Sequence, residues 1–198
     1  QLLQDVSHEL RSPLARVSVA LGIARRKAGP SAEDALLRIE HEVEQLNELI
    51  SQLLTLGRLN SQQLHPERSE FDLLTTVQQV AADADFESQE RGCEVRLIRG
   101  RPSLVNAVEP LLRSAIENVL RNAIAYTARG TAVEVEVSQR VDRAEPLAVV
   151  TVRDHGPGVP EEYLPAIFEP FRRVEAARDR GRGSVGLGLA IAARAVAI

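Results

Sequence analysis

The chain has 198 residues, of which 44% are apolar and 26% are charged, and its formal net charge is −4. This balance is typical of a globular protein and favours neither nucleic acid nor an anionic membrane as a partner. Its one cysteine, Cys93, excludes an internal disulfide, and no apolar run approaches the roughly 20 residues that span a bilayer.

The first third of the chain predicts two long helices separated by Gly29-Pro30, with Ser31 as the N-cap of the second. Apolar residues recur at heptad spacing along both helices. The clearest series are Leu36, Val43 and Ile50, and Ile39, Leu46 and Leu53. Because a lone hairpin with such a seam would leave apolar surface exposed, we expect a homodimeric four-helix bundle.

Residues 60–68 are polar and contain Pro66, which indicates a linker. The pattern after the linker predicts a mixed α/β sandwich. Its expected elements are a helix over 73–91 closed by Gly92, a strand over 95–98, a helix over 109–127, a strand over 133–137, a more buried strand over 147–152 and a helix from Gly186 onward.

His8 lies on the first predicted helix, about 140° or more from the centre of its apolar stripe at ~100° per residue, so we expect its ring to face solvent. An isolated exposed histidine is usually an ordinary surface residue. However, the adjacent Glu9 can orient or deprotonate the ring, and Pro13 predicts a kink. The same face continues through Ser12, Ala15, Val19 and Ile23, which suits either packing within a dimer or docking of another protein.

Four segments of the second region are compatible with a bound nucleotide. Asn118 and Asn122 share a helix face, and carboxamide oxygens suit Mg²⁺. Asp154 follows an apolar strand and can accept a hydrogen bond from an exocyclic amine, while Gly156 and Gly158 allow the backbone close to a flat ring. The simpler interpretations are exposed polar residues and an ordinary Asp/Gly turn.

The other two segments are a phenylalanine pair, Phe168 and Phe171, and the glycine-rich run 183–189, which opens a helix. Free N–H groups at such a helix start suit phosphate. The run lacks the Gly-Lys-Ser/Thr of a Walker A loop and the βαβ context of a Rossmann fingerprint. The simpler interpretation of the phenylalanine pair is a core staple, so each segment is weak evidence alone.

Taken together, the segments resemble the histidine kinases of bacterial two-component systems over nearly the whole chain. The matching motifs are the H-box around His8, the N-box around Asn122, the G1 box at 154–158, the F-box at 168–171 and the G2 box at 186–188. Residues 12–16 and 175–180 look similar to the Cpx-type envelope-stress kinases.

The resemblance implies a dimerisation and histidine phosphotransfer hairpin over 1–60, a linker over 61–69, and a catalytic ATP-binding domain of the Bergerat (GHKL) fold over 70–198 that lacks its final strands. It implies ATP-dependent autophosphorylation of His8, followed by transfer to an aspartate of a response regulator. We therefore expect the cytoplasmic part of a bacterial inner-membrane protein, attached to the membrane only through segments outside this chain.

The resemblance also assigns roles to residues. His8 is the expected phosphoacceptor and Glu9 the base, Ser12 positions water for dephosphorylating the partner, and Arg173 reaches the γ-phosphate. Asn122 is the expected Mg²⁺ ligand, Asn118 lies near the phosphates, Tyr126 near the adenine ring, and Asp154 binds the adenine amine. The remaining expected ATP-binding residues are Gly156, Gly158, Phe168, Phe171, Gly186, Leu187 and Gly188.

Two departures from the family pattern keep alternatives open. Ala125 stands where the family often has Lys or Arg, and Ser184-Val185-Gly186 replaces Gly-x-Gly. One alternative is a GHKL-type ATPase that hydrolyses ATP to water, and another is a non-catalytic dimeric scaffold that binds nucleotide. The hairpin with His8 and Glu9 favours the kinase.

Overall fold

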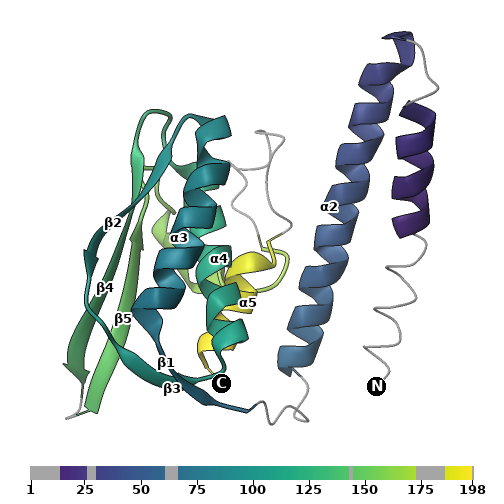
Figure 1. Cartoon of the computed structure of the whole chain (residues 1–198). Helices are drawn as coiled ribbons and strands as arrows, with labels where there is room; N and C mark the ends of the chain where they lie inside the picture. The colour runs from purple at the N-terminus through teal and green to yellow at the C-terminus, as the bar shows by residue number, and fades with distance from the viewer. Residues whose placement is uncertain (1–13, 26–29, 61–66, 143–144, 173–185, 198) are drawn as a thin grey trace. The chain divides into compact units, whose positions relative to one another are not determined.

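The computed structural model describes residues 14–25, 30–60, 67–142, 145–172 and 186–197 (Figure 1). The chain divides into two compact units, residues 1–62 and residues 63–198. A search of the helices in the described ranges for a segment long and apolar enough to cross a bilayer finds none.

The first unit contains the predicted helical hairpin. A helix over residues 14–25 lies beside α2 (Pro30–Asn60), and Arg25 Nη1 forms an ion pair with Glu40 Oε2 at 3.1 Å (Figure 1). The expectation that Ser31 is the N-cap is wrong, because α2 already begins at Pro30. Proline suits the first helical position, since its fixed φ is helical and its missing N–H would have no partner within the helix.

The two heptad series of α2 differ in burial. Val43 is only 7% exposed, whereas Ile39, Leu46 and Leu53 are 47%, 49% and 44% exposed in the single chain. One series therefore packs inside the hairpin, and the other forms an apolar stripe on its surface. The four-helix bundle itself stays a prediction.

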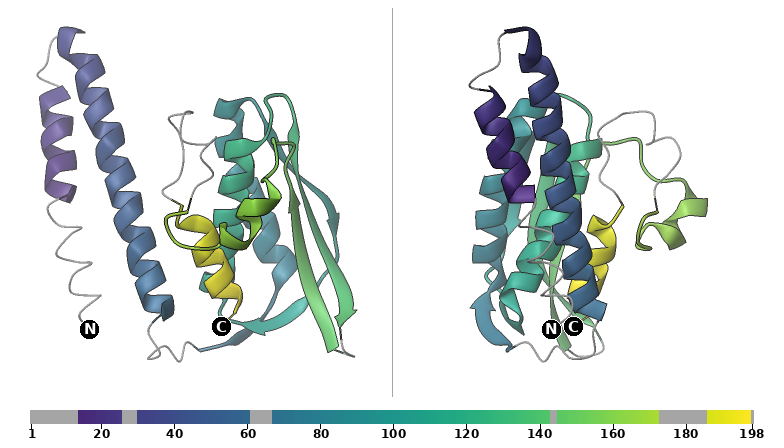
Figure 2. Two further views of the ribbon diagram at one scale, coloured as in Figure 1. Left: turned by 180° about the vertical axis from the view of Figure 1, so that it is seen from behind. Right: turned by 90° about the vertical axis from the view of Figure 1, so that its right-hand side faces the viewer.

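The second unit is an α/β sandwich, as predicted. Its main sheet has the order β2-β4-β5, with β2 parallel to β4 and β4 antiparallel to β5, and β1 pairs with β3 in a small antiparallel sheet. Helices α3 and α4 pack on one face of the main sheet and α5 packs against α4 (Figure 2). The strands are β1 (Ser69–Asp72), β2 (Glu94–Gly100), β3 (Leu104–Ala107), β4 (Ala132–Asp142) and β5 (Glu145–Arg153), and the helices are α3 (Leu73–Ser88), η1 (Gln89–Arg91), α4 (Glu109–Tyr126), η2 (Glu161–Ala166) and α5 (Gly188–Val196).

The core lies between the sheet and the two helices α3 and α4. Val133, Val135 and Val137 of β4 are fully buried, and Val77 of α3 and Leu120 of α4 face them across the same core. The expectation that 147–152 is the more buried strand is wrong. Within the described part of the sheet β5 is an edge strand with a neighbour on one side only, and Leu147 is 39% exposed, whereas β4 lies between two strands and its valines are fully buried.

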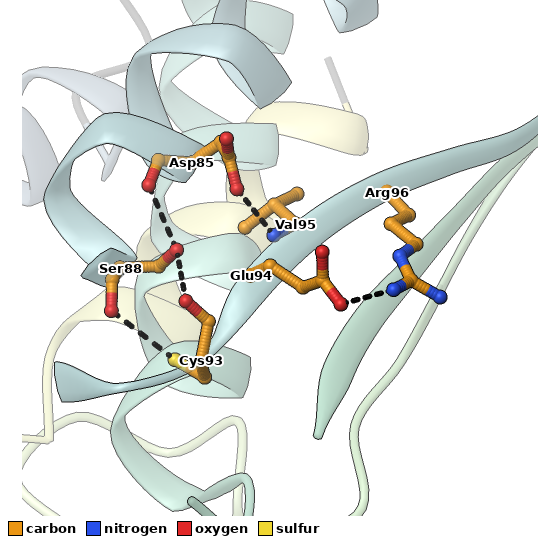
Figure 3. Close-up of polar contacts among 6 residues, drawn as sticks. All are labelled: Asp85, Ser88, Cys93, Glu94, Val95 and Arg96. Carbon is orange, nitrogen blue, oxygen red and sulfur yellow. Dashed lines mark hydrogen bonds and ion pairs between the residues drawn. The ribbon is translucent and has the colours of Figure 1, made fainter. Parts of the chain in front are cut away.

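A polar cluster ties the end of α3 to the start of β2 (Figure 3). Asp85 Oδ1 accepts a hydrogen bond from the Val95 N–H at 2.8 Å. The buried Ser88 hydroxyl lies 2.8 Å from the Asp85 carbonyl oxygen and 2.9 Å from that of Cys93. Gly92, predicted to close the helix, does so with a left-handed φ of 69°. The cluster fixes where the chain leaves α3 and enters the sheet.

The short strands β1 and β3 were not predicted. They are joined through Asp72, the N-cap of α3, whose Oδ1 accepts from the Leu74 N–H at 3.1 Å and from the Ser103 N–H at 2.8 Å. The small sheet thus begins at Ser69, the last residue of the predicted linker.

Candidate functional site

Helix α4 carries three of the predicted site residues on one face. Asn118, Asn122 and Tyr126 follow one another at four-residue spacing and all are half-buried. The first turn of α4 is fixed to α3, because the buried Thr76 hydroxyl donates to Glu109 Oε1 at 3.2 Å. Both helices rest on the sheet, so the three side chains project from a rigid element.

Asn118 contacts the start of α5. Its Nδ2 donates to the Ser114 carbonyl oxygen at 2.8 Å, which fixes the direction of the amide. A Cβ placed on Gly188 would lie only 2.9 Å from Asn118 Oδ1, so the glycine permits this close approach. Leu187, just before, is fully buried, and its carbonyl oxygen accepts from the Ile191 N–H at 2.9 Å. The amide oxygen of Asn118 therefore lies against the N-terminus of a helix.

The loop after β5 lies against the end of α4. The Gly156 N–H donates to Asp154 Oδ1 at 2.7 Å. A Cβ on Gly156 would lie 2.7 Å from both Asp154 Oδ1 and the backbone oxygen of Tyr126, so a glycine is needed here for steric reasons. Gly158 has a φ of +75°, which only glycine adopts without strain. The structure thus brings Asp154 and Tyr126, predicted from separate motifs, to one place.

Thr127 was missed by the sequence analysis, although it follows Tyr126 directly. It ends α4, with its N–H donating to the Ala123 carbonyl oxygen at 2.9 Å, and its Oγ1 accepts from the His155 N–H at 3.1 Å. A hydroxyl at the C-terminal end of a helix, one residue beyond a predicted site residue, was the available signal.

The F-box and the G2 box meet in space. The Phe171 N–H donates to the Gly186 carbonyl oxygen at 2.9 Å, and a Cβ on Gly186 would lie 2.7 Å from the Arg172 carbonyl oxygen. Phe171 has a φ of +64°, a strained conformation for a bulky residue. Phe168 and Phe171 are 52% and 59% exposed, so the interpretation of the pair as a core staple is wrong.

In the part of the chain that the structure describes, the other expected site residues are not joined by hydrogen bonds in this way. Within the described ranges no hydrogen bond joins Asn122 or Phe168 to the other candidate residues. His8, Glu9, Ser12 and Arg173 lie outside the described residues. Ala15, Val19 and Ile23, the rest of the predicted face of the first helix, are exposed. Among the described residues no group of three His, Cys, Asp or Glu side chains that could hold a metal is found.

The arrangement has the chemistry of a nucleotide site. The carboxylate of Asp154, just after β5, can accept a hydrogen bond from an amine, and Gly156 and Gly158 have no side chains that would block a flat ring beside it. The carboxamides of Asn118 and Asn122 lie on α4, and α5 begins at Gly188. Carboxamide oxygens can bind a cation, and the N–H groups of a helix N-terminus can bind phosphate.

Comparison with known families agrees with this chemistry. Residues 1–62 match the His Kinase A (phospho-acceptor) domain, and residues 107–198 match the histidine kinase-, DNA gyrase B- and HSP90-like ATPase domain. The second match makes the α/β unit an ATP-binding domain of that type. Since the two domains occur together in this order, the chain belongs to the sensor histidine kinases, as the motifs predicted.

Individual relatives support the same family. The chain is 38% identical over 206 residues to the sensor histidine kinase CpxA of Escherichia coli K12, a match that covers 99% of this chain and 41% of that protein. It is 33% identical over 197 residues to the sensor protein kinase PmrB of Pseudomonas aeruginosa, covering 99% and 40%. Full-length ShkA, solved in complex with AMPPNP, superposes with a TM-score of 0.77 at 27% identity, covering 99% of this chain and 40% of that one. The chain spans about two fifths of the length of these proteins.

Proposed function

We propose that this chain is the catalytic portion of a sensor kinase that phosphorylates His8 with ATP and passes the phosphoryl group to an aspartate of a response regulator. The observation that carries the proposal is the convergence of Asp154, Gly156 and Tyr126 at the end of α4, within an ATPase-type domain that follows a phosphoacceptor domain.

The adenine end of the nucleotide is assigned to Asp154. Its Oδ1 is used by the Gly156 N–H at 2.7 Å, which leaves Oδ2 to accept from the exocyclic amine. Gly156 and Gly158 keep side chains away from the ring, and the backbone of the half-buried Tyr126 lies against Gly156. The phosphate end of the proposed nucleotide site is formed by Gly186, Leu187 and Gly188, where N–H groups at the start of α5 bind the phosphates. Phe168 and Phe171 flank that end.

Mg²⁺ fits the residues present. Carboxamide oxygens are hard ligands of the kind it accepts, and Asn122 shares a helix face with Asn118, whose own oxygen lies against the start of α5. When bound by Asn122, the cation neutralises phosphate charge. Asn118 and Arg173 orient the phosphate oxygens.

Phosphoryl transfer proceeds in line. A ring nitrogen of His8 forms the N–P bond while the bond from the γ-phosphorus to the bridging oxygen breaks, and ADP leaves with that electron pair. Glu9 accepts the imidazole proton. The chain contributes mainly positioning and charge neutralisation. The phosphoryl group then passes from His8 to the regulator's aspartate, and Ser12 positions the water that later hydrolyses it.

The domain boundaries follow the same proposal, with residues 1–60 as the dimerising hairpin, 61–69 as the linker and 70–198 as the catalytic domain. The exposed Ile39, Leu46 and Leu53 stripe supports homodimerisation. The exposed Val19 and Ile23, on the predicted His8 face, support docking of the receiver domain there. Because the relatives are more than twice as long, the chain is proposed as the cytoplasmic part of a longer sensor.

Autophosphorylation of the purified chain with γ-labelled ATP and Mg²⁺ tests the function. We expect acid-labile, base-stable label on His8, none in His8→Gln, and unchanged AMPPNP binding in that variant. ATP hydrolysis without protein label would instead support the GHKL-type ATPase. Nucleotide binding with neither label nor hydrolysis would support the scaffold. Equal labelling of His8→Gln would eliminate His8 as the acceptor.

A further inference from the structure

We propose that Thr127 is a positioning residue of the nucleotide-base pocket: its hydroxyl, held by Thr131, fixes the loop that carries Asp154 and thereby sets the preference for adenine over guanine. The inference rests on the proposed function of Asp154. It adds a hydrogen-bond chain that links the end of α4 to the backbone N–H of His155, the residue next to Asp154.

The direction of each hydrogen bond in this chain follows from its ends. Thr131 Oγ1 lies 2.6 Å from the Ala128 carbonyl oxygen, which can only accept, so the Thr131 hydroxyl donates its proton there. Thr127 Oγ1 lies 2.8 Å from Thr131 Oγ1, and because the Thr131 proton is already used, Thr127 must be the donor. The lone pairs of Thr127 Oγ1 then face the His155 N–H, which donates at 3.1 Å.

The chain therefore fixes the residue next to Asp154. The Gly156 N–H, on the other side of His155, is taken by Asp154 Oδ1 itself. Gly156 also packs under the Tyr126 carbonyl oxygen, so the loop is held to the end of α4 at two neighbouring points. One point is steric and the other is the Thr127 hydroxyl. Loss of the hydroxyl would let the loop and its carboxylate move while the helix stays in place.

The position of Asp154 matters for base selection because an ionised carboxylate only accepts hydrogen bonds. The exocyclic amine of adenine can donate to it, whereas guanine has a carbonyl oxygen at that position and would place two acceptors face to face. A loosely held carboxylate can turn away from that oxygen. Weaker ATP binding and a smaller ATP-over-GTP preference should therefore appear together.

The test compares Thr127→Val, which keeps the side-chain shape without the hydroxyl, with Thr127→Ser, which restores the hydroxyl. KM and kcat for autophosphorylation are measured on the 198-residue chain with ATP and GTP, together with AMPPNP binding and hydrogen exchange at the His155 amide. For Thr127→Val we expect KM for ATP to rise about five- to tenfold, which corresponds to the loss of one hydrogen bond. The value of kcat should stay within about twofold of the wild type. The ATP-over-GTP preference should fall by a similar factor, and the His155 amide should exchange faster. Thr127→Ser should lie within about twofold of the wild type in all respects.

An unchanged KM in Thr127→Val, a loss of kcat without a change in KM, or a failure of Thr127→Ser to restore KM would each overturn the inference. Thr131→Val provides a second test if Thr127→Val does not fold. It removes the acceptor that orients Thr127, together with the Thr131 hydrogen bond to the Ala128 carbonyl oxygen, and leaves the Thr127 hydroxyl in place. KM for ATP should therefore rise about twofold, and no rise would contradict the proposed chain. Failure of the wild-type chain to bind AMPPNP would refute the proposed function as well, whereas normal wild-type binding with an unaltered Thr127→Val refutes the Thr127 role alone.

Discussion

At the scale of single residues, the candidate site depends on glycines that let backbone and side chains approach closely. Gly156 is the tightest case in the proposed base pocket, because an added Cβ would meet the Tyr126 carbonyl oxygen at 2.7 Å. A backbone atom cannot turn aside as a side chain can, so the loop itself must shift and carry Asp154 with it.

We therefore expect Gly156→Ala to weaken AMPPNP binding at least tenfold. Gly92→Ala is the comparison, because a Cβ there meets nothing within 4 Å and adds only the strain of its left-handed φ, at a residue outside the proposed site. That strain costs about 1–2 kcal/mol of folding stability. Calorimetric titration of both variants measures the difference, and circular dichroism checks that each is folded. Equal affinities for the two variants would show that the close packing at Tyr126 does not hold the pocket.

The residue types of this site were predictable, but their connections were not. Asp154, Asn118 and the glycines could be chosen as candidates from the sequence, because adenine, phosphate and close backbone approach each favour few residue types. Thr127 was missed because threonine suits many environments and its role depends on which backbone N–H lies opposite. The positive φ of Phe171 was also invisible, since phenylalanine is not a residue that such a conformation favours.

At the scale of elements, the position of the main sheet depends on how α3 ends. β2 pairs with β4 on one side, and on its other side the Val95 N–H is satisfied by Asp85 rather than by a strand (Figure 3). Val95 is buried, so without Asp85 that N–H would lose its partner away from water.

Asp85→Ala should lower the local stability of β2 by about 1–3 kcal/mol, the usual cost of a buried unsatisfied donor. Asp85→Asn keeps an accepting oxygen and should lower it by less. The exposed Asp83, on the same helix, provides the control Asp83→Ala, which should have little effect. Native-state hydrogen exchange at Val95 and its neighbours in β2 measures these differences. Similar exchange in Asp85→Ala and Asp83→Ala would mean that the Asp85 hydrogen bond does not stabilise the strand.

Element types were more predictable than element environments. The hairpin, α3, α4 and the alternating strand β4 were recognised because their periodicity extends over many residues. The strands β1 and β3 are too short to show a period, and their pairing depends on Asp72, which reads locally as a helix cap. The continuous apolar run of β5 suggested deep burial, yet burial depends on strand order, which is not encoded locally.

At the scale of the whole molecule, the feature that a single chain leaves unexplained is the apolar stripe on α2. Ile39, Leu46 and Leu53 are seven residues apart, so they lie along one side of the helix, and each is close to half-exposed. A helix with such a stripe is stabilised when another helix covers it. A second copy of the hairpin is the occupant that we propose, because it presents the same stripe and would complete a four-helix bundle.

A charge placed in the centre of this stripe should prevent that association. We expect Leu46→Glu to convert the chain from a dimer to a monomer, since a carboxylate buried opposite its symmetry mate would have no partner. Leu37→Glu is the matched control: Leu37 is 41% exposed on the same helix. It lies about 200° around the helix from Ile39 at ~100° per residue, on the opposite side. Sedimentation equilibrium measures the mass of each variant. A Leu46→Glu chain that remains dimeric, or a Leu37→Glu chain that dissociates equally, would place the dimer interface elsewhere on the molecule.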